Sequence, residues 1–138
     1  MDFILPLSIM ALLKLFLTFR LLLMAKDKLK NKEIKLSQFR LNEGEFPDEL
    51  LSARYQFQNM FEVPILFYLL CILHLIINNY TSIDVLLAWG FVIFRVLHFF
   101  IRLKNQRNLN IKLRTYIFII SLLFLTIGWF SFIIKYLI

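Results

Sequence analysis

Four long runs of apolar residues, separated by polar segments, dominate the pattern of this chain. The runs extend from about Phe3 to Met24, Phe57 to Ile77, Ile83 to Ile101 and Tyr116 to Ile138. A helix of about 20 apolar residues crosses the hydrocarbon core of a bilayer, which is roughly 30 Å thick. The pattern therefore predicts four membrane-spanning helices over approximately residues 3–24, 54–77, 83–103 and 115–137.

The composition excludes an ordinary water-soluble domain. Of the 138 residues, 60% are hydrophobic and 18% are charged, whereas soluble domains are about 45–50% apolar and about 25% charged. Three Gly and one Cys leave no Gly-rich phosphate loop and no disulfide framework. We predict an all-α protein in which residues 1–138 form one polytopic membrane domain, a four-helix bundle.

The first and third runs each have an alternative to a retained, membrane-spanning helix. The first contains Lys14 and Arg20 and lacks the basic start and small-residue cleavage site of a removable signal, so we expect a retained helix. The third is the shortest and contains Arg95 and His98. A helix that lies on the membrane surface needs a broad polar face, which this run lacks, so we expect it to span.

Basic residues are concentrated in two of the connections. Residues 25–52 contain five lysines and Arg40, and the connection after the third run contains Arg102, Lys104, Arg107, Lys112 and Arg114. The short connection 78–82 contains no basic residue. Because cytoplasmic loops carry an excess of Lys and Arg, we predict that residues 25–52 and 104–114 are cytoplasmic and that both termini lie outside. Orientation and anionic lipid headgroups account for the net charge of +7 without a nucleic-acid partner.

Polar residues interrupt the start of the second predicted helix. At about 100° per residue, Arg54, Gln58 and Glu62 fall at about 0°, 40° and 80° around the helix, and Asn59 at about 140°. They form one polar stripe. Pro64 follows and frees a backbone carbonyl one turn earlier, which favours a kink. The stripe predicts a polar pocket that opens toward the cytoplasm.

The third predicted helix has a similar stripe. Arg95, His98 and Arg102 share one face because they are spaced i, i+3 and i+7. Either arginine is a candidate partner for Glu62, because a lone carboxylate in hydrocarbon is costly. The residues alone fit a ligand site and a purely structural contact between helices equally well. No His or acid follows His98 at i+3 or i+4, so we expect no metal site.

Two sequence strings carry a resemblance to a known family. Residues 53–64 read Ala-Arg-Tyr-Gln-Phe-Gln-Asn-Met-Phe-Glu-Val-Pro, with Asn59 and Glu62 as the distinctive core. Trp89 to His98 includes Phe-Arg-Val-Leu-His, and Asn108 and Arg114 follow. Both strings resemble the MAPEG family, the membrane-associated proteins in eicosanoid and glutathione metabolism, and especially its bacterial members.

The resemblance implies a homotrimer that binds glutathione between neighbouring subunits near the cytoplasmic face, in a bacterial inner membrane. Asn59 and Glu62 match the family's Asn and Glu in that site, and Arg54 is a nearby candidate. His98 and Arg102 stand where aromatic residues are common in relatives. An arginine near the third or fourth helix activates the thiol in some relatives.

Arg107 and Arg114 are the positional candidates for that activating arginine. In such a site Glu62 suits the ammonium group of glutathione, and arginines suit its carboxylates. A guanidinium also stabilises the thiolate that attacks an electrophile or peroxide, and a lipophilic second substrate can enter from the lipid.

Three classes of function remain open from the sequence. The first is a glutathione-dependent transferase or peroxidase that acts on lipophilic electrophiles. The second is a non-catalytic membrane protein that holds another amphiphilic or anionic ligand in the polar cleft. The third is a structural membrane protein whose polar residues only lock helices together.

Overall fold

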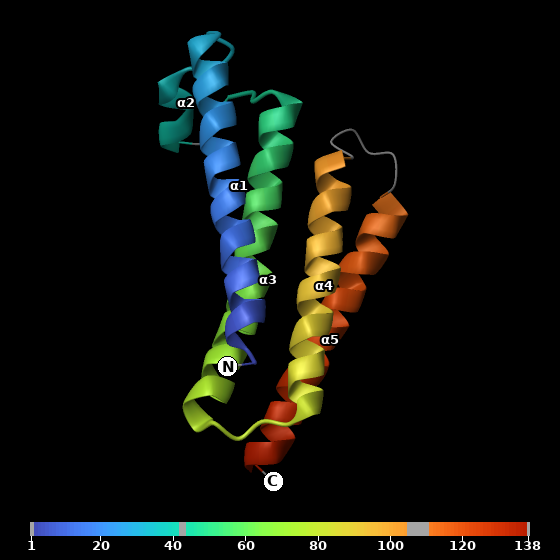
Figure 1. The fold of residues 1–138 in the computed structure, drawn as a ribbon. Helices are drawn as coiled ribbons and strands as arrows, with labels where there is room; N and C mark the ends of the chain where they lie inside the picture. The colour runs from blue at the N-terminus through green and yellow to red at the C-terminus, as the bar shows by residue number, and fades with distance from the viewer. Residues whose placement is uncertain (1, 42–43, 105–110, 138) are drawn as a thin grey trace. The chain divides into compact units, whose positions relative to one another are not determined.

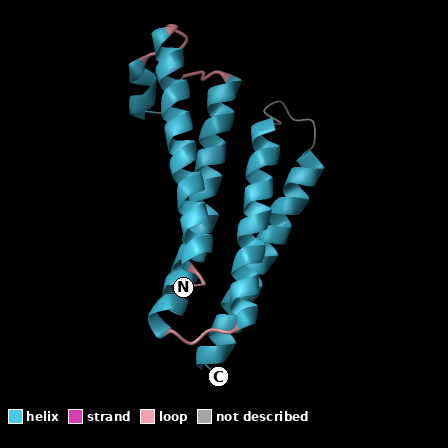
Figure 2. Ribbon diagram, viewed as in Figure 1, coloured by secondary structure: helices cyan, strands magenta, loops and turns pink. Residues whose placement is uncertain are grey.

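The computed structural model of the protein describes residues 2–41, 44–104 and 111–137. Within these ranges the chain consists of helices and the loops that join them, without a strand (Figures 1 and 2). The helices are α1 (Ile4–Lys30), α2 (Leu36–Leu41), α3 (Asp48–Ile77), α4 (Ser82–Lys104) and α5 (Ile111–Leu137).

The four long helices have the length and composition of membrane spans. α1, α3, α4 and α5 are each long and apolar enough to cross a bilayer, which confirms the four predicted spans. Large apolar side chains on them, among them Leu12, Phe19, Ile76 and Phe130, are more than half exposed. Such extensive apolar exposure is rare on soluble proteins. The protein is therefore an integral membrane protein whose exposed apolar side chains face lipid.

The helices extend beyond the apolar runs that predicted them. α1 continues to Lys30 rather than ending near residue 24, and α3 begins at Asp48 rather than near residue 54. Hydropathy reports which residues prefer lipid, whereas helical hydrogen bonds continue into polar residues. Asp48 and Glu49 occupy the first turn of α3, where carboxylates are stabilised by the positive end of the helix dipole.

The chain divides into two compact units. One unit contains Met1–Ala11 and Glu62–Ile138, and the other contains Leu12–Phe61. In the Leu12–Phe61 unit, two cations of α1 contact α3. The Lys14 amine donates a 2.9 Å hydrogen bond to the Phe57 carbonyl and lies 3.2 Å from the centre of the Phe57 ring. Arg20 donates a 3.2 Å hydrogen bond to Gln56. These contacts replace part of the hydration that the cations lose inside a membrane.

In the other unit, α4 and α5 lie side by side (Figure 1). Gly90 of α4 faces the ring of Phe124 on α5, and the missing side chain lets the two helices approach closely. The Phe124 ring also stacks on Phe94 with centroids 5.6 Å apart. Two positions of α4, one turn apart, therefore contact this ring.

The loop between α3 and α4 is joined to α5 by a polar network. Thr81 and Asp84 form a capping box: the Thr81 N–H donates to Asp84 at 2.7 Å, and the Asp84 N–H donates to the Thr81 hydroxyl at 3.4 Å. Ser131 donates a 2.9 Å hydrogen bond to the same carboxylate. Lys135 lies 3.8 Å from Asp84 and donates to the Asn79 carbonyl. The network fixes the start of α4 against the end of α5.

His74 has a packing role at this same end of the unit. Its buried ring stacks on Phe3 with centroids 4.8 Å apart and meets the edge of Phe132 at 5.3 Å. The Phe3 ring also meets Tyr80 edge-on at 5.1 Å. These contacts hold the first residues of the chain against the end of α3.

The Gly90→Ala variant is expected to lose about 1–3 kcal/mol of stability, the usual cost of overpacking. Its new methyl group would overlap the ring of Phe124, which also stacks on Phe94. Gly128→Ala is the matched control, because its methyl group would lie 3.1 Å from the flexible end of Leu70. Both substitutions raise helix propensity equally, so the difference in stability between the two variants reports the cost of the overlap with Phe124. Thermal unfolding of the detergent-solubilised protein measures it, and equal midpoints for both variants would contradict this packing.

Candidate functional site

A cavity of about 580 Å³ lies beside the first half of α3, inside the Leu12–Phe61 unit. Arg54 and Gln58, two residues of the predicted polar stripe, line it. The acids Glu45 and Asp48 line it as well, and the Arg54 guanidinium lies 4.8 Å from the centre of the Phe46 ring. The cavity therefore offers both signs of charge and an aromatic wall to an amphiphilic ligand.

The other two residues of the stripe lie further along α3 and do not line this cavity. Asn59 is half-buried, whereas Glu62 is exposed. Within the described ranges Glu62 forms no ion pair with either arginine that the sequence offered as a partner. An exposed carboxylate on a membrane-spanning helix is costly. Its pairing across a helix interface stays a prediction.

The three residues of the predicted α4 stripe are all buried. Arg95 is 0% exposed, and His98 and Arg102 are at most 9% exposed. The Arg95 guanidinium lies near two rings, 5.6 Å from the centre of Phe91 and 4.8 Å from that of Phe118. None of its three nitrogens has a hydrogen-bond partner among the described residues.

The described charged groups around His98 are all positive. The imidazole interacts electrostatically with Arg95, Arg102 and Arg114, and its ring lies 5.7 Å from the Phe118 ring. In the part of the chain that the structure describes, no carboxylate pairs with these three arginines. We call Arg95, His98, Arg102 and Arg114 the arginine cluster. Buried guanidinium groups without a counter-charge are costly, so the cluster is suited to bind an anion.

One predicted site residue, Arg107, lies outside the described residues. Among the residues that are described, no group of three His, Cys, Asp or Glu side chains is placed to hold a metal ion. The positive charge of the arginine cluster suits it to binding anions and stabilising negative charge.

The sequence did not predict the contacts of three ionisable groups that join helices in the structure. Lys14 and Arg20 hold α1 to α3, and Asp84 joins the ends of α4 and α5. All three lie inside membrane-spanning helices. That position was the available signal, because ionisable residues persist there only when they serve a purpose. Their partners depend on contacts between distant parts of the sequence.

Comparison with known proteins gives one match. The sequence model of the MAPEG family matches residues 3–134, which is nearly the whole chain. No curated protein and no solved structure shows a significant match.

Proposed function

Because the chain belongs to the MAPEG family, we propose that it is a glutathione-dependent transferase or peroxidase that acts on lipophilic electrophiles in the membrane. Members of this family generally use glutathione. The observation that supports the proposal most strongly is the arginine cluster, in which the buried guanidinium groups of Arg95 and Arg102 have no carboxylate partner among the described residues. Glutathione, which carries two carboxylates and a thiol that ionises, supplies the missing negative charge.

The polar groups of α3 suit the remaining parts of glutathione. Glu62 binds the ammonium group through a charge-assisted hydrogen bond. Gln58 and Asn59 bind peptide groups, because a side-chain amide both donates and accepts hydrogen bonds. Arg54 binds a carboxylate. The exposure of Glu62 and Gln58 leaves both side chains accessible to a ligand.

The arginine cluster contributes the electrostatics of the reaction. Arg95 and Arg102 bind carboxylate, and His98 donates a hydrogen bond from its ring. Arg114, in the first turn of α5, stabilises the glutathione thiolate, with Arg107 as the second candidate for this role. The thiolate is the nucleophile, so a guanidinium that lowers the thiol pKa raises the fraction of the reactive form. The sulfur then attacks an electrophilic carbon, forming a thioether as the bond to the leaving group breaks, or attacks a peroxide oxygen, so that the O–O bond breaks and an alcohol is released. In the second case another glutathione thiol attacks the resulting sulfenic acid, which gives the disulfide and water.

We further propose that the protein is a homotrimer with the glutathione sites between subunits, since members of the family are typically trimeric. The exposed carboxylate of Glu62 supports an assembly, because a neighbouring subunit removes it from contact with hydrocarbon. The basic connections at residues 25–52 and 104–114 favour a cytoplasmic site, with both termini outside and the protein in a bacterial inner membrane. The second substrate reaches the site from the lipid.

A second candidate function is a non-catalytic membrane protein that binds another anionic or amphiphilic ligand, or only uses its polar residues to hold helices together. Lys14 and Arg20 favour it, because both are intramembrane cations whose observed contacts join two helices. The two candidates differ in what the polar residues of α3 do. In the enzyme they hold a ligand, and in the structural protein they hold the assembly.

The Glu62→Gln variant separates these candidates. It removes a charge with little change in volume, so we expect the glutathione affinity to fall about 10-fold or more, the range of a charge-assisted hydrogen bond, while the detergent-corrected trimer mass stays constant. Asn59→Ala should act in the same direction. Asp27→Asn, which removes an exposed carboxylate elsewhere on α1, is the control. Dissociation of the trimer in Glu62→Gln, with or without glutathione present, would favour the structural role.

A further inference from the structure

The end of α1 places several lysines at the height of the lipid headgroups. The apolar run of α1 ends at Met24, but the helix continues to Lys30. At about 1.5 Å per residue, the last six residues extend about 9 Å beyond the apolar run. That length is close to the depth of the headgroup layer on one side of a bilayer, roughly 5–8 Å. Lys26, Lys28 and Lys30 therefore lie in or next to this layer.

The chain then forms a defined turn. The Glu33 N–H donates to the Lys28 carbonyl at 3.0 Å, and the Lys32 N–H donates to the Leu29 carbonyl at 3.1 Å. These two bonds define a Schellman motif with Lys32 in the left-handed conformation, at a φ of 59°. Glycine is the usual residue at that position because a side chain is disfavoured there. The presence of lysine keeps a cation at the tip of the turn.

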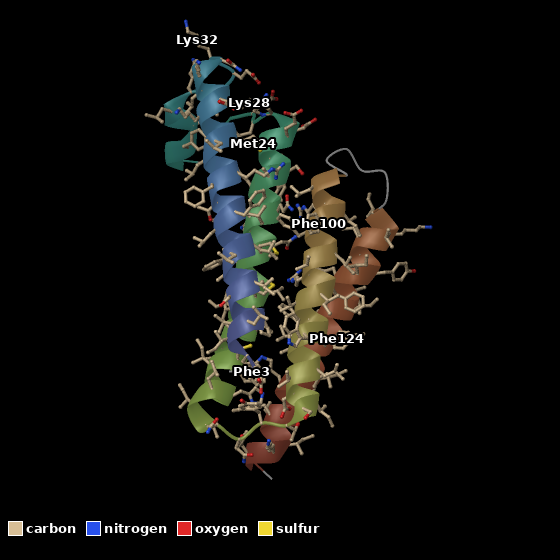
Figure 3. All side chains as sticks on the ribbon, viewed as in Figure 1. Phe3, Met24, Lys28, Lys32, Phe100 and Phe124 are labelled. Atoms are coloured by element: carbon tan, nitrogen blue, oxygen red, sulfur yellow. The ribbon has the colours of Figure 1, made fainter. Side chains whose placement is uncertain are left out.

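An ion pair stabilises the turn and leaves most of its lysines unpaired. The Lys28 amine lies 2.7 Å from Glu33 and 3.8 Å from Glu49, and its hydrogen bond lowers the pKa of the Glu33 carboxyl. Four other lysines of the segment are exposed and form no ion pair within the described ranges: Lys26, Lys30, Lys32 and Lys35. Figure 3 shows Lys32 at the tip, pointing away from the helices.

An apolar side chain accompanies these cations. Leu36, at the start of α2, is 75% exposed, although Ile34 two residues earlier is 3% exposed. An exposed leucine beside several lysines suits the boundary between headgroups and acyl chains, where apolar side chains insert and cations stay at the surface.

We propose that residues 26–36, which we call the basic turn, bind the phosphate groups of anionic phospholipids in the surrounding leaflet. The lysines contact the phosphates and Leu36 inserts among the acyl chains. The leaflet is the occupant because the lysines follow a membrane span directly, and a headgroup phosphate is the anion always present at that height. This surface is independent of the glutathione site and of which side of the membrane it faces.

Retention of lipid by the purified, detergent-solubilised protein tests the proposal. Native mass spectrometry measures bound phosphatidylglycerol relative to phosphatidylcholine. We expect Lys32→Gln to lower this ratio about five-fold, the usual contribution of one lysine next to an anionic membrane, and Lys32→Arg to preserve it. Lys112→Gln is the matched control, because it removes an equal exposed charge from α5.

Three results would overturn the proposal: equal losses for Lys32→Gln and Lys112→Gln, an unchanged ratio in Lys32→Gln, or displacement of the lipid by an equal concentration of inorganic phosphate. The first would assign the effect to net charge, and the third would assign the surface to a free anion. Leu36→Ser adds a readout of insertion, since it should weaken retention of both lipids. Unfolding is not a concern at these exposed positions, and a thermal midpoint equal to that of the unmodified protein verifies it.

Discussion

Replacing Arg95 by methionine is expected to raise the stability of the protein and at the same time to weaken its binding of glutathione. The Arg95 guanidinium is 0% exposed and has no hydrogen-bond partner among the described residues. Replacing buried charges by apolar residues of similar volume often stabilises a protein by about 1–4 kcal/mol. Methionine retains the contact with the rings of Phe91 and Phe118 while it removes the unpaired charge.

The loss of affinity follows from the same charge. If Arg95 binds a carboxylate of glutathione, its removal leaves that carboxylate buried and unpaired, which costs about 2–5 kcal/mol, or at least about 30-fold in affinity. Thermal unfolding and titration calorimetry of the same preparation measure both effects. Arg95→Lys keeps the charge but loses the planar pair of donors, so an intermediate affinity is expected. A variant that is less stable and binds glutathione normally would show that Arg95 has a structural role instead.

The second large effect is expected from Arg114→Leu, which should lower kcat for glutathione conjugation by about 10²–10³-fold. This is the usual loss when one donor to a developing negative charge is removed. The glutathione affinity should change much less, because Arg114 is assigned to the thiolate rather than to the carboxylates. Steady-state kinetics with a lipophilic electrophile separates kcat from binding.

The dependence of activity on pH tests the same role of Arg114, and the direction of the change can be predicted. A guanidinium next to the sulfur favours the thiolate and lowers the pKa of the bound thiol, so the unmodified enzyme should be active at neutral pH. Without Arg114 the thiol pKa returns toward its ordinary value, and activity should recover as the pH rises. Lys112→Gln removes a neighbouring charge from α5 and should leave the profile unchanged. An unaltered profile in Arg114→Leu would transfer the role to another group, with Arg107→Leu as the next variant to measure.

The four spans were predictable because a helix that crosses the hydrocarbon core must consist almost entirely of apolar residues. Runs of about 20 apolar residues leave few alternatives to a spanning helix. The short helix α2 (Leu36–Leu41) and the polar ends of α1 and α3 were not predicted. Six residues show too little periodicity for a helix to be recognised, and hydropathy falls at the membrane surface even where helical hydrogen bonds continue.

The sequence could predict which candidate site residues share a helix face, but not which neighbouring residues they contact. Helical periodicity correctly places Arg95, His98 and Arg102 at related positions, and all three are buried. The same reasoning gives only relative angles around one helix axis, so it does not say which neighbour a face meets. This is why Glu62 is exposed although it belongs to a stripe whose other end, at Arg54, lines a cavity. The stacking of His74 on Phe3 joins residues far apart in the chain and leaves no local pattern.

Binding of glutathione to the purified, unmodified protein tests the central claim most directly. Titration calorimetry in detergent should show saturable binding with a Kd below about 1 mM, within the usual range for enzyme substrates. An analogue in which a methyl group blocks the thiol should also bind, because Arg95, Arg102 and Glu62 are assigned to the carboxylates and the ammonium group rather than to the sulfur. The absence of saturable binding by a folded, assembled preparation would contradict the proposed function and leave the non-catalytic membrane protein as the better account.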